Sequence, residues 1–129
     1  MRQLIRRWIL AALAVLGAFL VAGIAGSAAT SALGFWHLPG AGFSAALAVV
    51  LSSYFAPPSR RFVCACCAFA IGAILAWMLL EPSWYPERYG ALAYQPTHLP
   101  VIATFLGGLV GVVTAGVLSL RSGSRLFRH

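Results

Sequence analysis

The sequence predicts an all-α integral membrane protein with four transmembrane helices, and three observations support that prediction. First, 61% of the 129 residues are hydrophobic and only 9% are charged, whereas soluble domains usually carry about 25% charged residues. Second, the apolar residues form long runs that are separated by proline, glycine and arginine. Third, the charged residues lie between or beyond these runs. We therefore expect residues 1–129 to form a single membrane domain whose first partner is the lipid bilayer.

The first half of the chain contains an uncharged stretch that is long enough for two helices. A helix needs about 20 apolar residues to cross a hydrocarbon core about 30 Å thick. The segment from Gly34 to Gly42 is rich in glycine, contains a proline and supplies the break. We predict spans at about 8–33 and 39–56. Pro57 ends the second span, because proline cannot continue the helical hydrogen-bond ladder.

The second half of the chain predicts two more spans, at about 62–80 and 99–120, the latter with Pro100 in its first turn. An arginine pair precedes the third span, and a glutamate followed by a proline ends it. Residues 81–98 then form the one sizeable external loop, with both acids, four aromatic residues and three prolines. Aromatic rings suit the membrane interface and prolines stiffen a loop. We expect this loop to be ordered on the outer surface.

The placement of the arginines predicts the orientation of the chain. All nine basic residues are arginine, and eight of them fall on one side if the chain crosses four times from a cytoplasmic start. The exception is Arg88, in the external loop. The positive-inside rule therefore predicts cytoplasmic N- and C-termini. The Ala-rich, Lys-free composition is typical of a bacterial inner-membrane protein. The same placement argues against a nucleic acid as the partner, in spite of a net charge of +7.

The N-terminal segment has an alternative interpretation as a cleaved signal peptide. It combines a basic start, an apolar stretch and a run of small residues at 25–29. Signal peptides have apolar cores of about 7–15 residues, and the run from Trp8 to Ala25 is longer. We therefore expect a retained first span.

The chain also shows a weak internal repeat. Arg-Arg followed by an aromatic residue opens the first and third spans, and His-Leu-Pro precedes the second and fourth. This pattern favours two tandem helical hairpins in the same orientation, related by an axis along the membrane normal. In so alanine-rich a sequence, chance agreement is the alternative.

Small residues recur at every fourth position and predict helix-packing interfaces. Spacing of four places each set on one helix face, and small faces let helix backbones approach closely in lipid. These ridges pack the four helices together, or one of them faces another subunit, for which the Gly107–Gly111 pair is the best candidate. The residues that we assign to packing are Ala18, Ala22, Gly26, Gly72, Gly107, Gly111 and Ala115.

Two residue types offer weak candidates for chemical sites. Cys64 and Cys67 lie three apart on one helix face and are weak candidates for a soft metal, whereas packing as small apolar side chains is the preferred explanation. His37 and His98 stand at the outer ends of the second and fourth spans, where they would meet in a symmetric pair of hairpins and hold a haem. We expect no cofactor, because no other ligand accompanies either pair.

The predicted spans contain no Asp, Glu, Lys or Arg, so they offer no charged side chain for catalysis or proton coupling inside the membrane. We expect a non-catalytic polytopic protein that acts as an oligomer or as an accessory subunit of a larger membrane complex, and not an enzyme. Two alternatives remain open. One is a small oligomeric transporter, flippase or channel. The other is a haem- or quinone-binding membrane anchor that uses His37 and His98.

Overall fold

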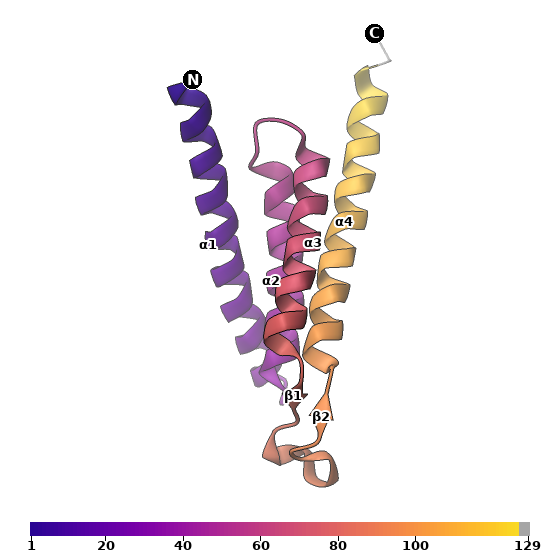
Figure 1. The fold of residues 1–129 in the computed structure, drawn as a ribbon. Helices are drawn as coiled ribbons and strands as arrows, with labels where there is room; N and C mark the ends of the chain where they lie inside the picture. The colour runs from indigo at the N-terminus through magenta and orange to yellow at the C-terminus, as the bar shows by residue number, and fades with distance from the viewer. Residues whose placement is uncertain (127–129) are drawn as a thin grey trace.

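The computed structural model describes residues 1–126, most of which lie in four long helices (Figure 1). Each of the four is long and apolar enough to cross a membrane. The described part of α4 ends at the same end of the bundle at which α1 begins (Figure 1). Arg128, which belongs to the predicted basic C-terminus, lies outside the described residues. The helices are α1 (Arg2–Ala32), α2 (His37–Phe55), α3 (Arg61–Leu80) and α4 (Leu99–Leu126).

The outermost helices are longer than the predicted spans. The first begins at Arg2 rather than near residue 8, and the last extends to Leu126 rather than ending near residue 120. Arginine and leucine are good helix formers, so the backbone ladder continues past the apolar stretch. The break before α2 is shorter than predicted, because α2 already begins at His37. Pro39 is accommodated in its first turn, where its missing N–H needs no partner.

The turn between α1 and α2 is built on a glycine at the helix C-terminus. Gly34 has φ +79°, a left-handed conformation that glycine adopts without steric cost. The N–H of Phe35 donates to the carbonyl of Thr30 at 2.9 Å, and the N–H of Gly34 donates to the carbonyl of Ser31 at 3.0 Å. This pair of bonds is a Schellman motif. It lets the chain reverse within four residues and places α2 directly beside α1.

The second helix is the centre of the bundle. α2 packs against α1, α3 and α4, and α3 also packs against α4. α1 contacts almost nothing but α2. The chain thus consists of two consecutive helical hairpins, but they pack unequally. A symmetric pair would match the α2–α3 contact with an equal α1–α4 contact, which α1 does not make.

Close backbone contact holds α1 on α2. A Cβ atom added at Gly26 would overlap Ser44 Oγ and the carbonyl oxygen of Gly40, and one added at Gly40 would overlap Thr30. The Ser44 hydroxyl also donates across the interface to the carbonyl of Ala22 at 2.8 Å. Only glycine leaves room for helices to approach this closely. The predicted small face of α1, with Ala18 half-buried on it, therefore lies toward α2.

The glycine ridge of α4 also faces α2. A Cβ atom at Gly107 would overlap the backbone of Phe43, and one at Gly111 would come within 3.0 Å of the Val50 side chain. Ala115, one turn further along, is fully buried. The structure therefore assigns this ridge to packing inside the chain, rather than to the contact with another subunit that the spacing alone allowed.

The best-buried cluster lies where α2, α3 and α4 meet. Tyr54, Val50 and Ala65 form it together with Ala115, and the half-buried Phe69 packs against it. α1 contributes nothing to this cluster. The three-helix unit of α2, α3 and α4 thus has a shared core, whereas α1 is attached at its edge.

We predict that Gly107→Ala destabilises the bundle by about 1–3 kcal/mol, the usual cost of overpacking. The new methyl group meets the backbone of Phe43, which cannot rotate away. Thermal unfolding in mild detergent measures the effect. The matched control is Gly17→Ala, an exposed position of α1 where nothing lies within 4 Å of the added Cβ atom. That variant should be neutral or more stable by up to about 1 kcal/mol, because alanine favours helix over glycine. Equal losses in both variants would contradict the packing described.

Candidate functional site: an apolar trough between α1 and α3

Two neighbouring hollows lie between α1 and α3, with α2 as their floor. The larger has a volume of about 690 Å³ and the smaller about 430 Å³. Val15, Phe19 and Val49 line both, so the hollows form one continuous depression, which we call the trough. The trough exists because α1 packs on α2 almost alone, whereas α3 packs mainly against α2 and α4.

The walls of the trough are almost entirely hydrocarbon. Among the described residues, no charged side chain lines either hollow. The polar groups of the side chains in the described walls are the hydroxyls of Ser53 and Thr104, the thiol of Cys64 and the indole N–H of Trp8. Thr104 donates its hydroxyl hydrogen to the carbonyl of Pro100 at 2.7 Å, within its own helix. Such walls suit apolar matter.

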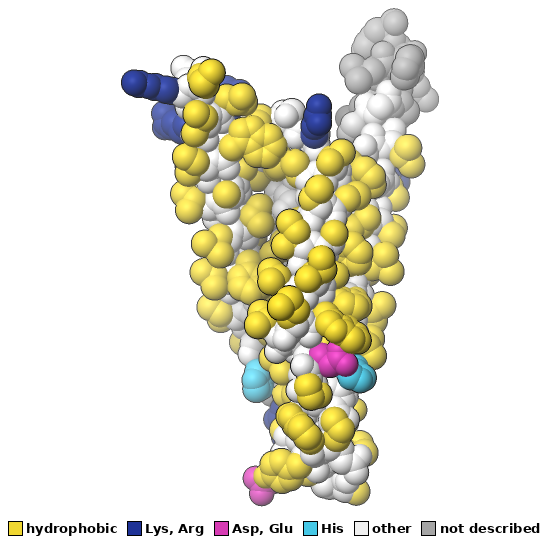
Figure 2. All heavy atoms as spheres, in the orientation of Figure 1, with side chains coloured by type: hydrophobic (Ala, Val, Ile, Leu, Met, Phe, Trp, Pro, Cys, Tyr) yellow, Lys and Arg dark blue, Asp and Glu magenta, His cyan; other side chains and the backbone are white. Residues whose placement is uncertain are grey.

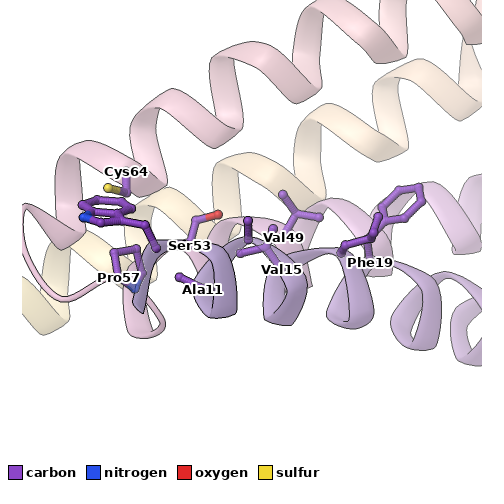
Figure 3. Close-up of a pocket in the computed structure, with 10 residues that line it drawn as sticks. Ala11, Val15, Phe19, Val49, Ser53, Pro57 and Cys64 are labelled. Atoms are coloured by element: carbon purple, nitrogen blue, oxygen red, sulfur yellow. The ribbon is translucent and has the colours of Figure 1, made fainter. Parts of the chain in front are cut away.

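The smaller hollow occupies the end of the trough near the start of α1. Figure 3 shows Ala11, Val15 and Phe19 spaced along α1, opposite side chains of α2. Pro57 and Cys64 lie at one end of this row (Figure 3). The side chains of Ala11 and Pro57 are small, so space remains between the helices at this end, and this space is the smaller hollow.

The candidate metal ligands do not gather into a centre. Cys64 is half-buried in the wall of the trough, whereas Cys67 is exposed, and both are free thiols. The Cys64 thiol lies 3.9 Å from the carbonyl oxygen of Ser59. Among the described residues, no group of three or more histidine, cysteine or acidic side chains is placed to hold a metal ion. The soft-metal hypothesis thus gains no support from the geometry.

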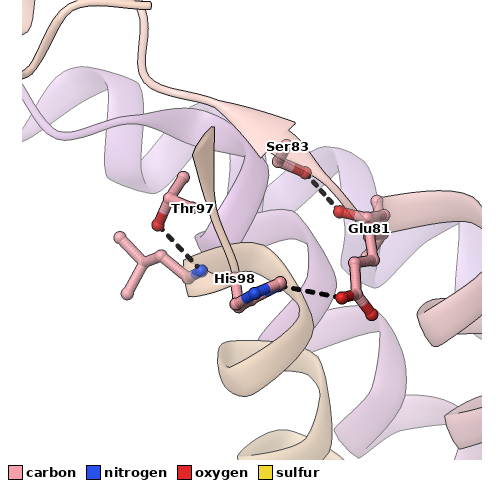
Figure 4. Close-up of polar contacts among 6 residues, drawn as sticks. Glu81, Ser83, Thr97 and His98 are labelled. Carbon is pink, nitrogen blue, oxygen red and sulfur yellow. Dashed lines mark hydrogen bonds and ion pairs between the residues drawn. The ribbon is translucent and has the colours of Figure 1, made fainter. Parts of the chain in front are cut away.

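The two histidines have different surroundings. His98 lies just before α4, where its Nδ1 is 3.5 Å from Glu81 Oε1 (Figure 4). Its ring also stacks on Trp77, with centroids 6.2 Å apart and planes 9° from parallel. His37 is exposed at the start of α2, and no hydrogen bond or ring contact joins it to His98 in the described part of the chain. The geometry gives His98 a carboxylate partner rather than a second haem ligand.

The segment between α3 and α4 is an ordered hairpin. β1 (Ser83–Trp84) pairs antiparallel with β2 (Pro96–Thr97), and a 3₁₀ helix, η1 (Glu87–Leu92), forms its tip. Beyond the strands, the N–H of Tyr94 donates to the carbonyl of Tyr85 at 2.9 Å. In Figure 1 the hairpin continues past the ends of α3 and α4, rather than turning aside from them.

The hairpin is tied to the turn between α1 and α2. The Arg88 guanidinium donates to the carbonyl of Phe35 at 2.7 Å. The ring of Tyr85 lies 5.9 Å from that of Trp36, which is 7% exposed. These contacts join segments 50 residues apart in the sequence and brace the two helical hairpins against each other at this end. Sequence reasoning missed both of them, and also the pairing of Glu81 with His98. The sequence signal for the pairing of Glu81 with His98 was that these two residues stand at the two ends of the loop between α3 and α4.

Comparison with protein-family models, with curated proteins and with solved structures finds no match. The functional argument therefore rests on the trough, the distribution of charge and the hairpin. Among these three features, the trough is the one that offers space for another molecule.

We predict that Gly90→Ala loosens the hairpin. Gly90 has φ +57° and ψ −116°, a conformation that side-chain-bearing residues rarely adopt, and such strain costs about 1–3 kcal/mol. Trypsin cleavage after Arg88 should be faster in the variant than in the unaltered protein. Ala91→Ser, a change at the exposed neighbouring residue, is the control and should cleave at the original rate. Rapid cleavage of the unaltered protein would contradict an ordered hairpin.

Proposed function

We propose that the chain is a non-catalytic, multi-pass inner-membrane protein that works as a subunit of a membrane assembly, with copies of itself or with other membrane proteins. The trough is the observation that carries this proposal. It is an apolar depression that runs beside α1, and nothing in the described chain fills it. A transmembrane helix from another subunit has an apolar surface, which can pack into such a depression.

One of the glycines in the wall of the trough, Gly72, supports a helix as the occupant. Gly72 has nothing within 4 Å of the position of a Cβ atom. By contrast, Gly26 and Gly107 each meet another helix at closer than contact distance. Glycine weakens a helix interior unless a close approach makes use of it. Gly72 therefore leaves room for a backbone that the chain itself does not supply.

The chemistry of the trough supports a structural rather than a catalytic or proton-coupled role. The nearest carboxylate on α3 is that of Glu81 at its end, and this group faces His98 instead of standing within the helix. Proton-coupled transporters depend on ionisable groups within the spans. The described walls of the trough offer none beyond a thiol.

The charge distribution supports cytoplasmic termini in a bilayer. Figure 2 shows most of the visible basic side chains at the end of the molecule where α1 begins, and the acids and described histidines toward the other end, where Arg88 also lies. Between these ends the visible surface is largely hydrophobic (Figure 2). This arrangement is the one expected of a bundle that crosses the bilayer with its basic end inside.

We predict the topology from this charge distribution. Alkaline phosphatase, which folds only outside the cytoplasm, should be active when fused after Gly90 in the hairpin. Fusions after Ser59 or after Gly123 should be inactive, because both positions lie at the basic end. Equal expression of the three fusions is the control. Activity after Ser59 would refute a cytoplasmic N-terminus with four spans.

We also predict that Gly72→Leu disrupts assembly without unfolding the chain. Leucine would occupy space at the trough wall, and no atom of its own chain lies within 4 Å of its Cβ position. The unaltered protein should migrate in mild detergent as a complex larger than its 13.6 kDa mass, and the variant should shift toward the monomer. Ala70→Leu, at an exposed position of the same helix outside the trough, should leave the complex intact. A monomeric unaltered protein without any co-purifying partner would overturn the proposal.

A further inference from the structure

The smaller hollow has the shape and chemistry of a site for a hydrocarbon chain. It is bounded by Trp8 on α1, by Pro57 in the loop between α2 and α3, and by Cys64 in the first turn of α3. α1 diverges from α2 toward its own start (Figure 1), and the smaller hollow lies at this end.

Unbalanced positive charge surrounds the same end. Arg7 precedes Trp8 and stands one turn before Ala11, which lines the hollow. Arg61 stands one turn before Cys64, on the stripe that continues along the trough wall, and Arg60 is its neighbour. All three arginines are exposed, and within residues 1–126 none of their guanidinium groups makes a hydrogen bond or an ion pair. Both acids of the chain lie at the far end, at and within the hairpin.

The start of α3 adds to this positive field. Arg60 is its N-cap residue, with φ 50°, and no side chain caps the helix. The first turn also contains no acid. Uncapped N–H groups at a helix start carry a partial positive charge, which complements a phosphate. The field therefore favours a negatively charged group directly above the apolar hollow.

We infer that this end of the trough binds one anionic phospholipid, with an acyl chain in the smaller hollow and its phosphate beside Arg7, Arg60 and Arg61. Basic pockets between transmembrane helices are known to take anionic lipid headgroups. A second copy of the chain would bring like charges together here, and a neutral lipid would leave the arginines unbalanced. The inference requires the chain to lie in a bilayer, but it does not depend on the subunit assembly proposed above.

Native mass spectrometry of the full-length protein in mild detergent tests the inference. The probes are phosphatidylglycerol and phosphatidylcholine with identical acyl chains. We expect one phosphatidylglycerol to be retained on the order of 100-fold more tightly than phosphatidylcholine, since each of the three arginines contributes about fivefold. Equal retention of the two lipids would overturn the inference.

Two double variants separate a site from general attraction. Arg60→Gln with Arg61→Gln should weaken phosphatidylglycerol binding by about 25-fold, at about fivefold for each arginine. Arg2→Gln with Arg6→Gln removes the same charge from the face of α1 opposite Trp8, as the helical period places it, and should change binding less than twofold. Equal effects of the two double variants would show diffuse attraction and overturn the site.

A third variant tests the acyl chain. Ala12 is exposed in the wall of the smaller hollow, so Ala12→Trp should fill the hollow and lower lipid retention, while thermal unfolding checks that the bundle persists. Ala12→Leu serves if the larger residue unfolds the protein. Excess inorganic phosphate should not displace the lipid, because it lacks the chain. Displacement by phosphate, or unchanged retention in a folded Ala12 variant, would refute binding of the chain in the hollow.

Discussion

The close approach of helix backbones to α2 is the constraint on which the rest of the structure depends. In lipid, apolar side chains gain nothing from leaving the solvent, so helices associate through tight packing and hydrogen bonds. α2 supplies both. Gly40 admits Thr30 of α1, and the backbone at Phe43 admits Gly107 of α4. The hydroxyl of Ser44 adds a bond to α1 at 2.8 Å. The central helix thus positions its neighbours through a few small residues rather than through a large core.

The open side of the molecule follows from that constraint. The four-residue turn after α1 holds it beside α2, and the glycine contact lies near that turn, so the opposite end of α1 is free to diverge. α3 instead shares its contacts between α2 and α4, which draws it away from α1. The resulting trough lies between helices whose positions are fixed by other contacts. Filling it therefore does not require the bundle to rearrange.

Much of the fold, but little of the site, could be predicted from the sequence. Long apolar runs bounded by arginine, glycine and proline located the four helices, because backbone polar groups in apolar surroundings must be satisfied within each helix. Spacing of four identified the small faces but not their partners. Gly107 and Gly72 belong to equivalent patterns, yet the first is buried against Phe43 and the second is open. The difference between these two glycines depends on how helices that are distant in the sequence pack together. The same is true of the hydrogen bond from Arg88 to Phe35. The local residue pattern contains no information on such contacts.

If the chain spans a bilayer, as we propose, the unequal lengths of its helices affect the surrounding lipid. At 1.5 Å per residue, the 19 residues of α2 and the 20 of α3 span about 28 and 30 Å, whereas the 31 of α1 and the 28 of α4 span about 46 and 42 Å. The two shorter helices, α2 and α3, match a hydrocarbon core of about 30 Å, so they would resist thinning or thickening of the membrane around them. The outer pair can tilt or extend into the headgroup region without exposing apolar surface. Hydrophobic mismatch would therefore be borne by α2 and α3, and it would favour the residence of this protein in membranes of their thickness.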